Sequence, residues 1–163
     1  MFNSEFNLQY LIWIIAFLPV VGSSFLIFIN NTLTVKRLGL TFSFLTFFLS
    51  LFLWIFFDKS YSRFQFVSEL SWSPLANLNF SLGVDGISLF FVILTTLLFP
   101  LCLLMSWNSV TKKVKEYVIS FLVMETLLIL VFSVRDLLLF YIFFESVLIQ
   151  MFVIIGVWGS RDR

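Results

Sequence analysis

Two glutamates each lie inside a long apolar stretch of the sequence. Glu125 is the only charged residue in 117–134, and Glu145 is the only one in 137–160. A carboxyl group near the centre of a membrane helix costs roughly 2.5 to 3.5 kcal/mol on insertion scales, so it usually faces protein or water and marks an ion or proton path. We therefore take both as candidate proton-translocating groups. For Glu125 the alternative stays open that it only fastens two helices.

The spacing of the two glutamates places them at one depth. Glu125 lies ten residues before Arg135 and Glu145 ten residues after it, with Asp136 completing a short polar break between the two stretches. At 1.5 Å per residue, both carboxyl groups are expected about 15 Å from this turn, near the middle of a bilayer. The spacing does not show whether they face each other.

Polar residues accompany Glu145 along its helix. Tyr141 lies four residues before it on the same face, while Ser146 and Gln150 form a second pair four residues apart. We expect this polar stripe to point into a helix bundle, with Tyr141, Ser146 and Gln150 as possible polar support for the acid.

Composition assigns the chain to the integral membrane class. Hydrophobic residues make up 61% of it and charged residues 12%, against about 45–50% and about 25% in soluble domains. Histidine is absent, and Cys102 is the only cysteine, so imidazole chemistry and a disulfide framework are excluded and no metal site is expected. A net charge of +1 with few clustered basic residues gives no footprint for nucleic acid.

Five apolar stretches are long enough to span a bilayer, and spanning segments of this kind must be helices. We therefore predict an all-α membrane protein that forms a single membrane domain over 1–163. The start of the sequence lacks the basic region of a cleaved signal peptide, so the first span is expected to remain. The predicted spans are 10–30, 38–57, 87–107, 117–134 and 137–158.

The longest connection, between the second and third spans, shows strand-like alternation. Leu70 and Trp72 alternate with polar residues, as do Phe80 and Leu82, on either side of a turn at 73–76. The pattern predicts a β-hairpin over 64–84, outside the membrane and packed on this protein or on a neighbour. Asp85 is then predicted to cap the third helix, in preference to a role in a proton path.

Lysine and arginine set the predicted orientation. Because basic residues favour the cytoplasmic or matrix side, the N-terminus is expected outside and the C-terminus inside. The inner side would carry Lys36, Arg37, Lys112, Lys113, Lys115, Arg161 and Arg163, and the outer side Lys59, Arg63 and Arg135.

Two sequence motifs resemble a known family. They are Leu138-Leu-Phe-Tyr-Ile-Phe-Phe-Glu-Ser-Val-Leu-Ile-Gln-Met-Phe-Val-Ile-Ile-Gly-Val-Trp-Gly159, and before it Gly83-Val-Asp-Gly-Ile-Ser-Leu-Phe90. In this order they closely resemble the NADH-ubiquinone oxidoreductase chain 4 family, the antiporter-like proton-pumping membrane subunits of respiratory complex I. The resemblance extends over essentially the whole chain and implies the amino-terminal part of an antiporter-like fold.

The resemblance implies a role for Glu145 as the family's membrane glutamate, which relays protons with lysines on later helices. The chain departs from the family at Gln150, where a proline is usual. It also has five predicted spans, whereas the family has about fourteen. We therefore expect a second chain to carry the remaining helices. Other complex I membrane subunits and lipid are further expected partners.

The resemblance also implies where the redox chemistry lies. No cofactor is expected in this chain, and NADH, flavin, iron-sulfur clusters and ubiquinone are expected in other subunits. The implied location is the mitochondrial inner membrane, with a bacterial plasma membrane as the alternative. Two other functions remain open: a non-catalytic scaffold or assembly fragment of a membrane complex, and a subunit of a related cation/proton antiporter.

Overall fold

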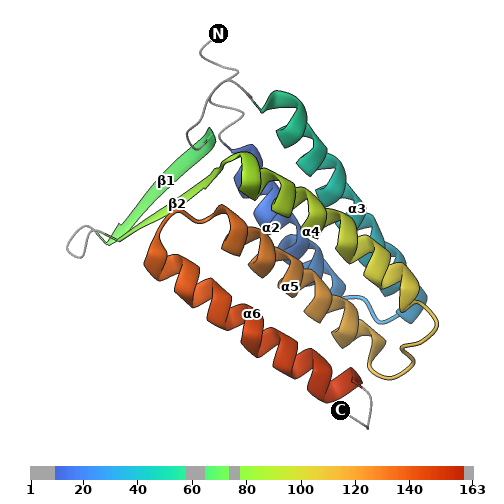
Figure 1. The fold of residues 1–163 in the computed structure, drawn as a ribbon. Coiled ribbons are helices and arrows are strands. Elements are labelled where there is room, and N and C mark those ends of the chain that lie inside the picture. The colour runs from blue at the N-terminus through green and yellow to red at the C-terminus, as the bar shows by residue number, and fades with distance from the viewer. Residues whose placement is uncertain (1–9, 58–64, 74–77, 160–163) are drawn as a thin grey trace.

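The computed structural model describes residues 10–57, 65–73 and 78–159, which form a helical bundle with one β-hairpin (Figure 1). Among these residues, four helices are long and apolar enough to cross a membrane, and α2 is a shorter apolar helix of 16 residues. The predicted fold class, an all-α membrane protein with a hairpin between the second and third helices, is confirmed. The elements are α2 (Leu11–Leu26), α3 (Thr32–Phe56), β1 (Gln65–Ser73), β2 (Leu78–Val84), α4 (Gly86–Met105), α5 (Val114–Ser133) and α6 (Leu137–Trp158).

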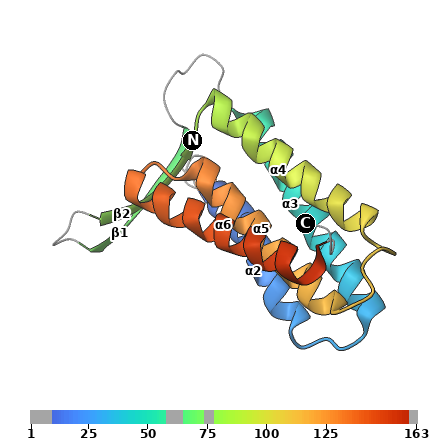
Figure 2. The same ribbon diagram turned by 60° about the horizontal axis from the view of Figure 1, so that its bottom comes forward.

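Helix α5 is the centre of the bundle. It packs against α2, α3, α4 and α6, whereas α6 packs chiefly on α5 and lies at the edge of the bundle in Figure 1 and in front of α5 in Figure 2. Successive helices run in opposite directions, which gives the bundle two ends. We call the end with the hairpin and the α5–α6 turn the hairpin end, and the end with the connections 27–31 and 106–113 the basic end.

Two helices begin earlier than the sequence predicts. Helix α3 begins at Thr32 instead of residue 38, because the Asn31 side chain accepts a hydrogen bond from Leu33 N (3.0 Å) and caps the helix. Lys36 therefore lies within α3 and not in the connection before it. Helix α5 likewise begins at Val114 and not at residue 117.

The hairpin is anchored to the bundle at its base. Arg135 N, in the α5–α6 turn, donates to Ser81 O of β2 (3.1 Å). The Phe80 ring lies between those of Trp13 on α2 (5.1 Å between centroids) and Phe143 on α6 (5.9 Å). These contacts fix the hairpin relative to the pair of helices that carry the two glutamates.

Aspartate caps begin the two helices next to the hairpin. Asp85 accepts hydrogen bonds from Ile87 N (3.1 Å) and Ser88 N (2.7 Å), as predicted. Asp136 accepts one from Leu138 N (3.0 Å) at the start of α6. Both caps satisfy backbone N–H groups that a helix leaves without internal partners.

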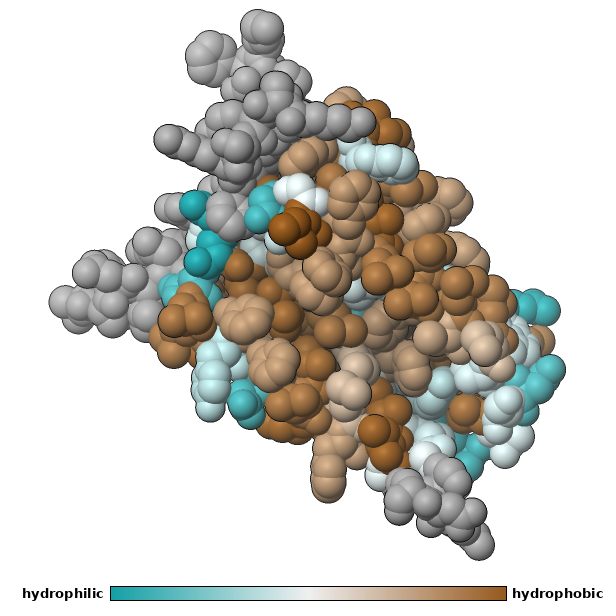
Figure 3. Space-filling view, in the orientation of Figure 1, coloured by the Kyte–Doolittle hydropathy of each residue, from teal (hydrophilic) through white to brown (hydrophobic). Residues whose placement is uncertain are grey.

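The surface is apolar over its middle. Figure 3 shows hydrophobic residues across the central part of this face, with hydrophilic residues gathered toward the ends. This distribution is what a bilayer requires of the helices that face it, since hydrocarbon offers no partners to polar side chains.

Candidate functional site

Glu125 is buried in the middle of the bundle. Its side chain on α5 is 0% exposed, and Ser43 Oγ of α3 donates a hydrogen bond to its Oε2 at 3.3 Å. Its Oε1 has no hydrogen-bond partner in the part of the chain that the structure describes. Because burying a polar group costs free energy unless it is hydrogen-bonded, this carboxyl depends on the Ser43 hydroxyl for its one hydrogen bond among the described residues.

Small residues of α3 create the close approach that this hydrogen bond needs. Gly39 lies one turn before Ser43, and a Cβ added at Gly39 would overlap Val118 Cγ1 of α5. Small residues at the contact between membrane helices allow their backbones to come together in this way. Gly39 thus brings the Ser43 hydroxyl within reach of the Glu125 carboxyl.

Ser43 was not among the predicted site residues, although its position in the sequence carries a signal. Gly39, Ser43, Thr46 and Ser50 recur at helical spacing, and all four are buried in the structure. Further along the same stripe, the hydroxyl groups of Ser50 and Thr96 of α4 are 2.8 Å apart. The stripe therefore joins α3 to α4 and α5 through polar as well as close backbone contacts.

Glu145 has different surroundings from those predicted. Its side chain is exposed, and Tyr141, four residues earlier, is 61% exposed. Of the predicted polar stripe, the described residues thus leave Tyr141 and Glu145 uncovered, whereas Gln150 contacts α5. The reason is that α6 packs on α5 through another face, which buries Leu139 and Val147.

Ser146 and Gln150 do not orient the Glu145 carboxyl. Ser146 Oγ donates to Ile142 O of its own helix at 2.9 Å. Gln150 Nε2 donates to Ser120 O of α5 at 3.2 Å, which ties the two helices together across their contact. No hydrogen bond reaches the Glu145 carboxyl from the described residues.

The two glutamates are equally far along their helices from the α5–α6 turn. Glu125 lies eight residues before the end of α5 at Ser133, and Glu145 eight residues after the start of α6 at Leu137. At 1.5 Å per residue each is about 12 Å into its helix. The two positions are thus equally far from the turn along their helices, but one carboxyl lies inside the bundle and the other on its surface.

The sequence is closely similar to known membrane subunits. It is 58% identical over 147 residues to the NADH-ubiquinone oxidoreductase chain 4 of Arabidopsis thaliana, covering 89% of this chain and 30% of that protein. It is 52% identical over 180 residues to that of Prototheca wickerhamii, covering 100% of this chain and 34% of that protein. No protein-family model matches the chain.

Over most of its length, the chain belongs to the NADH-ubiquinone oxidoreductase chain 4 family. The fold agrees with this assignment. A chain of respiratory complex I from Thermus thermophilus with bound NADH superposes with a TM-score of 0.74 and 26% identity, over 90% of this chain and 29% of that one. The chain spans about a third of the length of the curated chain 4 relatives that it matches.

Proposed function

We propose that this chain forms part of a proton-translocating membrane module of NADH:ubiquinone oxidoreductase, in which Glu145 is a proton-transfer group. One observation carries the proposal. Glu145 lies about 12 Å into a 22-residue apolar helix, on a face that no described part of this chain covers. A carboxyl at that depth is costly against lipid and is normally turned toward protein or a water-filled cavity.

We therefore expect the exposed face of α6 to be covered by further protein. Chain 4 relatives are about three times as long as this chain, so their additional length supplies helices that would cover α6. We propose that such helices place a polar or basic side chain opposite Glu145. The pair would then pass a proton between sites at the middle of the membrane.

Glu125 has a separate place in this proposal. Its carboxyl is enclosed by α3 and α5 and accepts a hydrogen bond from the Ser43 hydroxyl. Any proton that it exchanges must therefore travel within the bundle. The alternative, that Glu125 only fastens α3 to α5, is favoured by that same hydrogen bond. We therefore assign the main transfer step to Glu145.

The proposal places the electron-transfer chemistry elsewhere. NADH, flavin, iron-sulfur clusters and ubiquinone would bind to other subunits, and this chain would respond to their redox reactions through its neighbours. It would lie in the mitochondrial inner membrane, with its basic end toward the matrix and the hairpin outside. The hairpin would contact a neighbouring subunit, which crosslinking from Asn79 would capture.

Co-purification tests the assembly part of the proposal. An affinity tag on this chain should retain the membrane subunits of NADH:ubiquinone oxidoreductase from solubilised membranes, together with a chain that carries the remaining helices. Recovery of this chain alone in mild detergent would contradict the proposal. Recovery with the complex, combined with unchanged pumping after loss of the Glu145 carboxyl, would support the scaffold alternative instead.

A further inference from the structure

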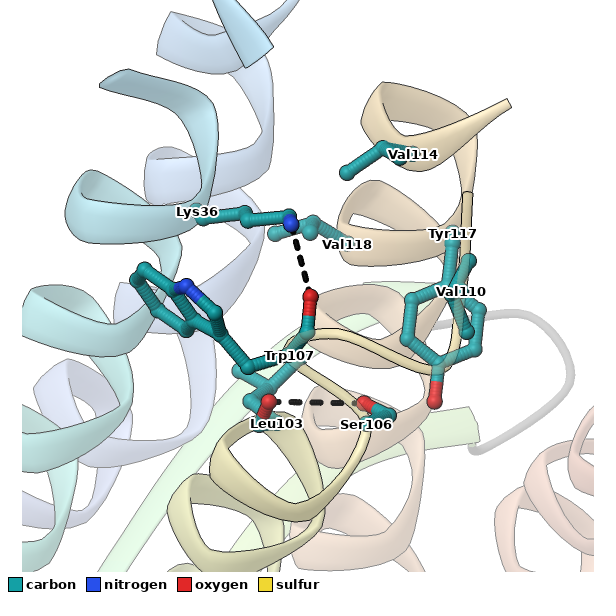
Figure 4. Close-up of a pocket in the computed structure, with 8 residues that line it drawn as sticks. All are labelled: Lys36, Leu103, Ser106, Trp107, Val110, Val114, Tyr117 and Val118. Atoms are coloured by element: carbon teal, nitrogen blue, oxygen red, sulfur yellow. Dashed lines mark hydrogen bonds between the residues drawn. The ribbon is translucent and has the colours of Figure 1, made fainter. Parts of the chain in front are cut away.

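A pocket lies at the basic end, between the start of α3, the end of α4 and the start of α5 (Figure 4). Its floor is apolar, and its polar groups are an ammonium, two hydroxyls and an indole. The lining residues are Lys36, Leu103, Ser106, Trp107, Val110, Val114, Tyr117 and Val118. Apolar walls beside a few polar groups suit an amphipathic ligand.

Lys36 is held at this pocket by two contacts. Its Nζ donates to Trp107 O at 2.6 Å and lies 5.5 Å from the centre of the Trp107 ring. An ammonium group carries three donors, so this hydrogen bond leaves donors for a further acceptor. Figure 4 shows the Lys36 side chain extending from α3 toward Trp107 at the end of α4.

Positive charge gathers at the end of the bundle where the pocket lies. Of the six lysine and arginine residues in the described part of the chain, five lie at this end and Arg135 lies at the other. Glu116 is the only acidic residue that the structure describes at the basic end. The five are Lys36, Arg37, Lys112, Lys113 and Lys115.

Exposed apolar side chains lie on the outer side of α4 at this end. In the last two turns of α4, Leu101, Leu104 and Met105 are exposed, and they point away from the buried pocket residue Leu103. An acyl chain of a ligand held at the ammonium would reach this hydrocarbon surface around the end of α4. Free phosphate could use the charges but not this surface.

We propose that the pocket binds the headgroup of an anionic phospholipid, with its phosphate at Lys36 and an acyl chain along the exposed side of α4. Basic pockets between membrane helices recognise such headgroups, and each lysine near the membrane surface contributes about 1 kcal/mol. The proposal goes beyond proton transfer and requires only that the helices span a membrane. It does not depend on the role of either glutamate.

Photocrosslinking in the intact membrane complex tests the proposal. The complex is reconstituted with phosphatidylglycerol that carries a diazirine in its headgroup, or with the matching phosphatidylcholine probe, and labelled peptides are mapped by mass spectrometry. We expect the anionic probe to label residues 103–118 about fivefold more than the zwitterionic probe. A binding free energy of about 1 kcal/mol from one lysine corresponds to about this ratio of affinities. Equal labelling by the two probes would overturn the proposal.

Three variants assign the effect to the pocket. Lys36→Gln keeps a side-chain N–H for Trp107 O but removes the charge, so it should abolish most of the preference, whereas Lys36→Arg should retain it. Lys112→Gln removes a charge at the same end from a residue outside the pocket lining and should change the preference less than Lys36→Gln. Equal effects of Lys36→Gln and Lys112→Gln, or crosslinks from 103–118 to protein instead of lipid, would contradict a lipid site here.

Discussion

Glu125 and Glu145 lie the same eight residues from the turn that joins their helices, yet the first is fully buried and the second is exposed. The short turn fixes their equal depth. Their different surroundings follow from the number of neighbours: α5 is packed by four helices and α6 chiefly by one. The same substitution at the two positions should therefore have different consequences.

Replacing Glu145 by glutamine should abolish most proton translocation while assembly is retained. Glutamine keeps the size of the side chain but cannot ionise, and a positioned acid–base group is typically worth about 10² to 10⁴ in rate. We expect NADH-driven proton uptake in sealed vesicles to fall more than about tenfold. Glu145→Asp keeps a carboxyl and should retain partial activity. Glu116→Gln, an exposed acid at the basic end, is the matched control, and normal pumping by assembled Glu145→Gln would refute the proposed role.

Ser43→Ala should destabilise the bundle through Glu125. It removes the one hydrogen bond that reaches the buried carboxyl from the described residues, and an unsatisfied buried polar group costs about 1–3 kcal/mol. Glu125→Gln should affect pumping less than Glu145→Gln. In a double-mutant cycle of denaturant unfolding, the losses of unfolding free energy caused by Ser43→Ala and by Glu125→Gln should be non-additive. Strict additivity would show that Ser43 and Glu125 are not energetically coupled.

Gly39→Ala should force α3 away from α5. The added methyl group would overlap Val118 Cγ1, and such overpacking typically costs about 1–3 kcal/mol. Gly86→Ala, at the first residue of α4, is a matched control, since a Cβ there meets nothing within 4 Å and alanine favours a helix. Thermal unfolding of the purified complex should separate the two variants, and equal stability would argue against the close α3–α5 contact.

Cysteine labelling should place the two ends of the bundle on opposite sides of the membrane. In a Cys102→Ser background, Ser109→Cys reports the basic end and Ser71→Cys reports the hairpin. The positive-inside rule predicts that an impermeant thiol reagent reaches the first only from the matrix or cytoplasmic side and the second only from the outer side. Labelling of both from one side would rule out this topology.

Acid should weaken the start of α4 through Asp85. The backbone N–H of Ser88 holds the pKa of this carboxyl below its usual 3.8, against the opposing effect of partial burial. Because the folded-state pKa is the lower one, the carboxylate stabilises the fold above pH 3.8, and this contribution is lost as the pH falls through the lowered value. Asp85→Asn keeps the cap but not the charge. Its unfolding curves should lose this acid dependence, and curves unchanged from those of the unmodified protein would contradict the role.

The sequence by itself determined the membrane class, the positions of the helices along the chain and the equal spacing of the two glutamates from the α5–α6 turn. Runs of about twenty apolar residues can only be helices in hydrocarbon, and a fixed rise per residue converts distance along the chain into depth. The aspartate cap at Asp85 was predictable for a similar reason, because its partners are the next residues of the chain. The start of α3 was predicted wrongly, since the Asn31 cap begins the helix before its apolar run begins.

Only the tertiary structure decided which way each side chain points. The small and hydroxyl residues of α3 mark a packing face but not its partner, so the contact between Ser43 and Glu125, 82 residues apart, was decided by the close packing at Gly39. The exposure of Glu145 was decided in the same way. Helix α6 packs on α5 through Val147 and Gln150. Because a single neighbouring helix covers only one face of α6, this contact leaves Glu145 on the opposite, uncovered surface.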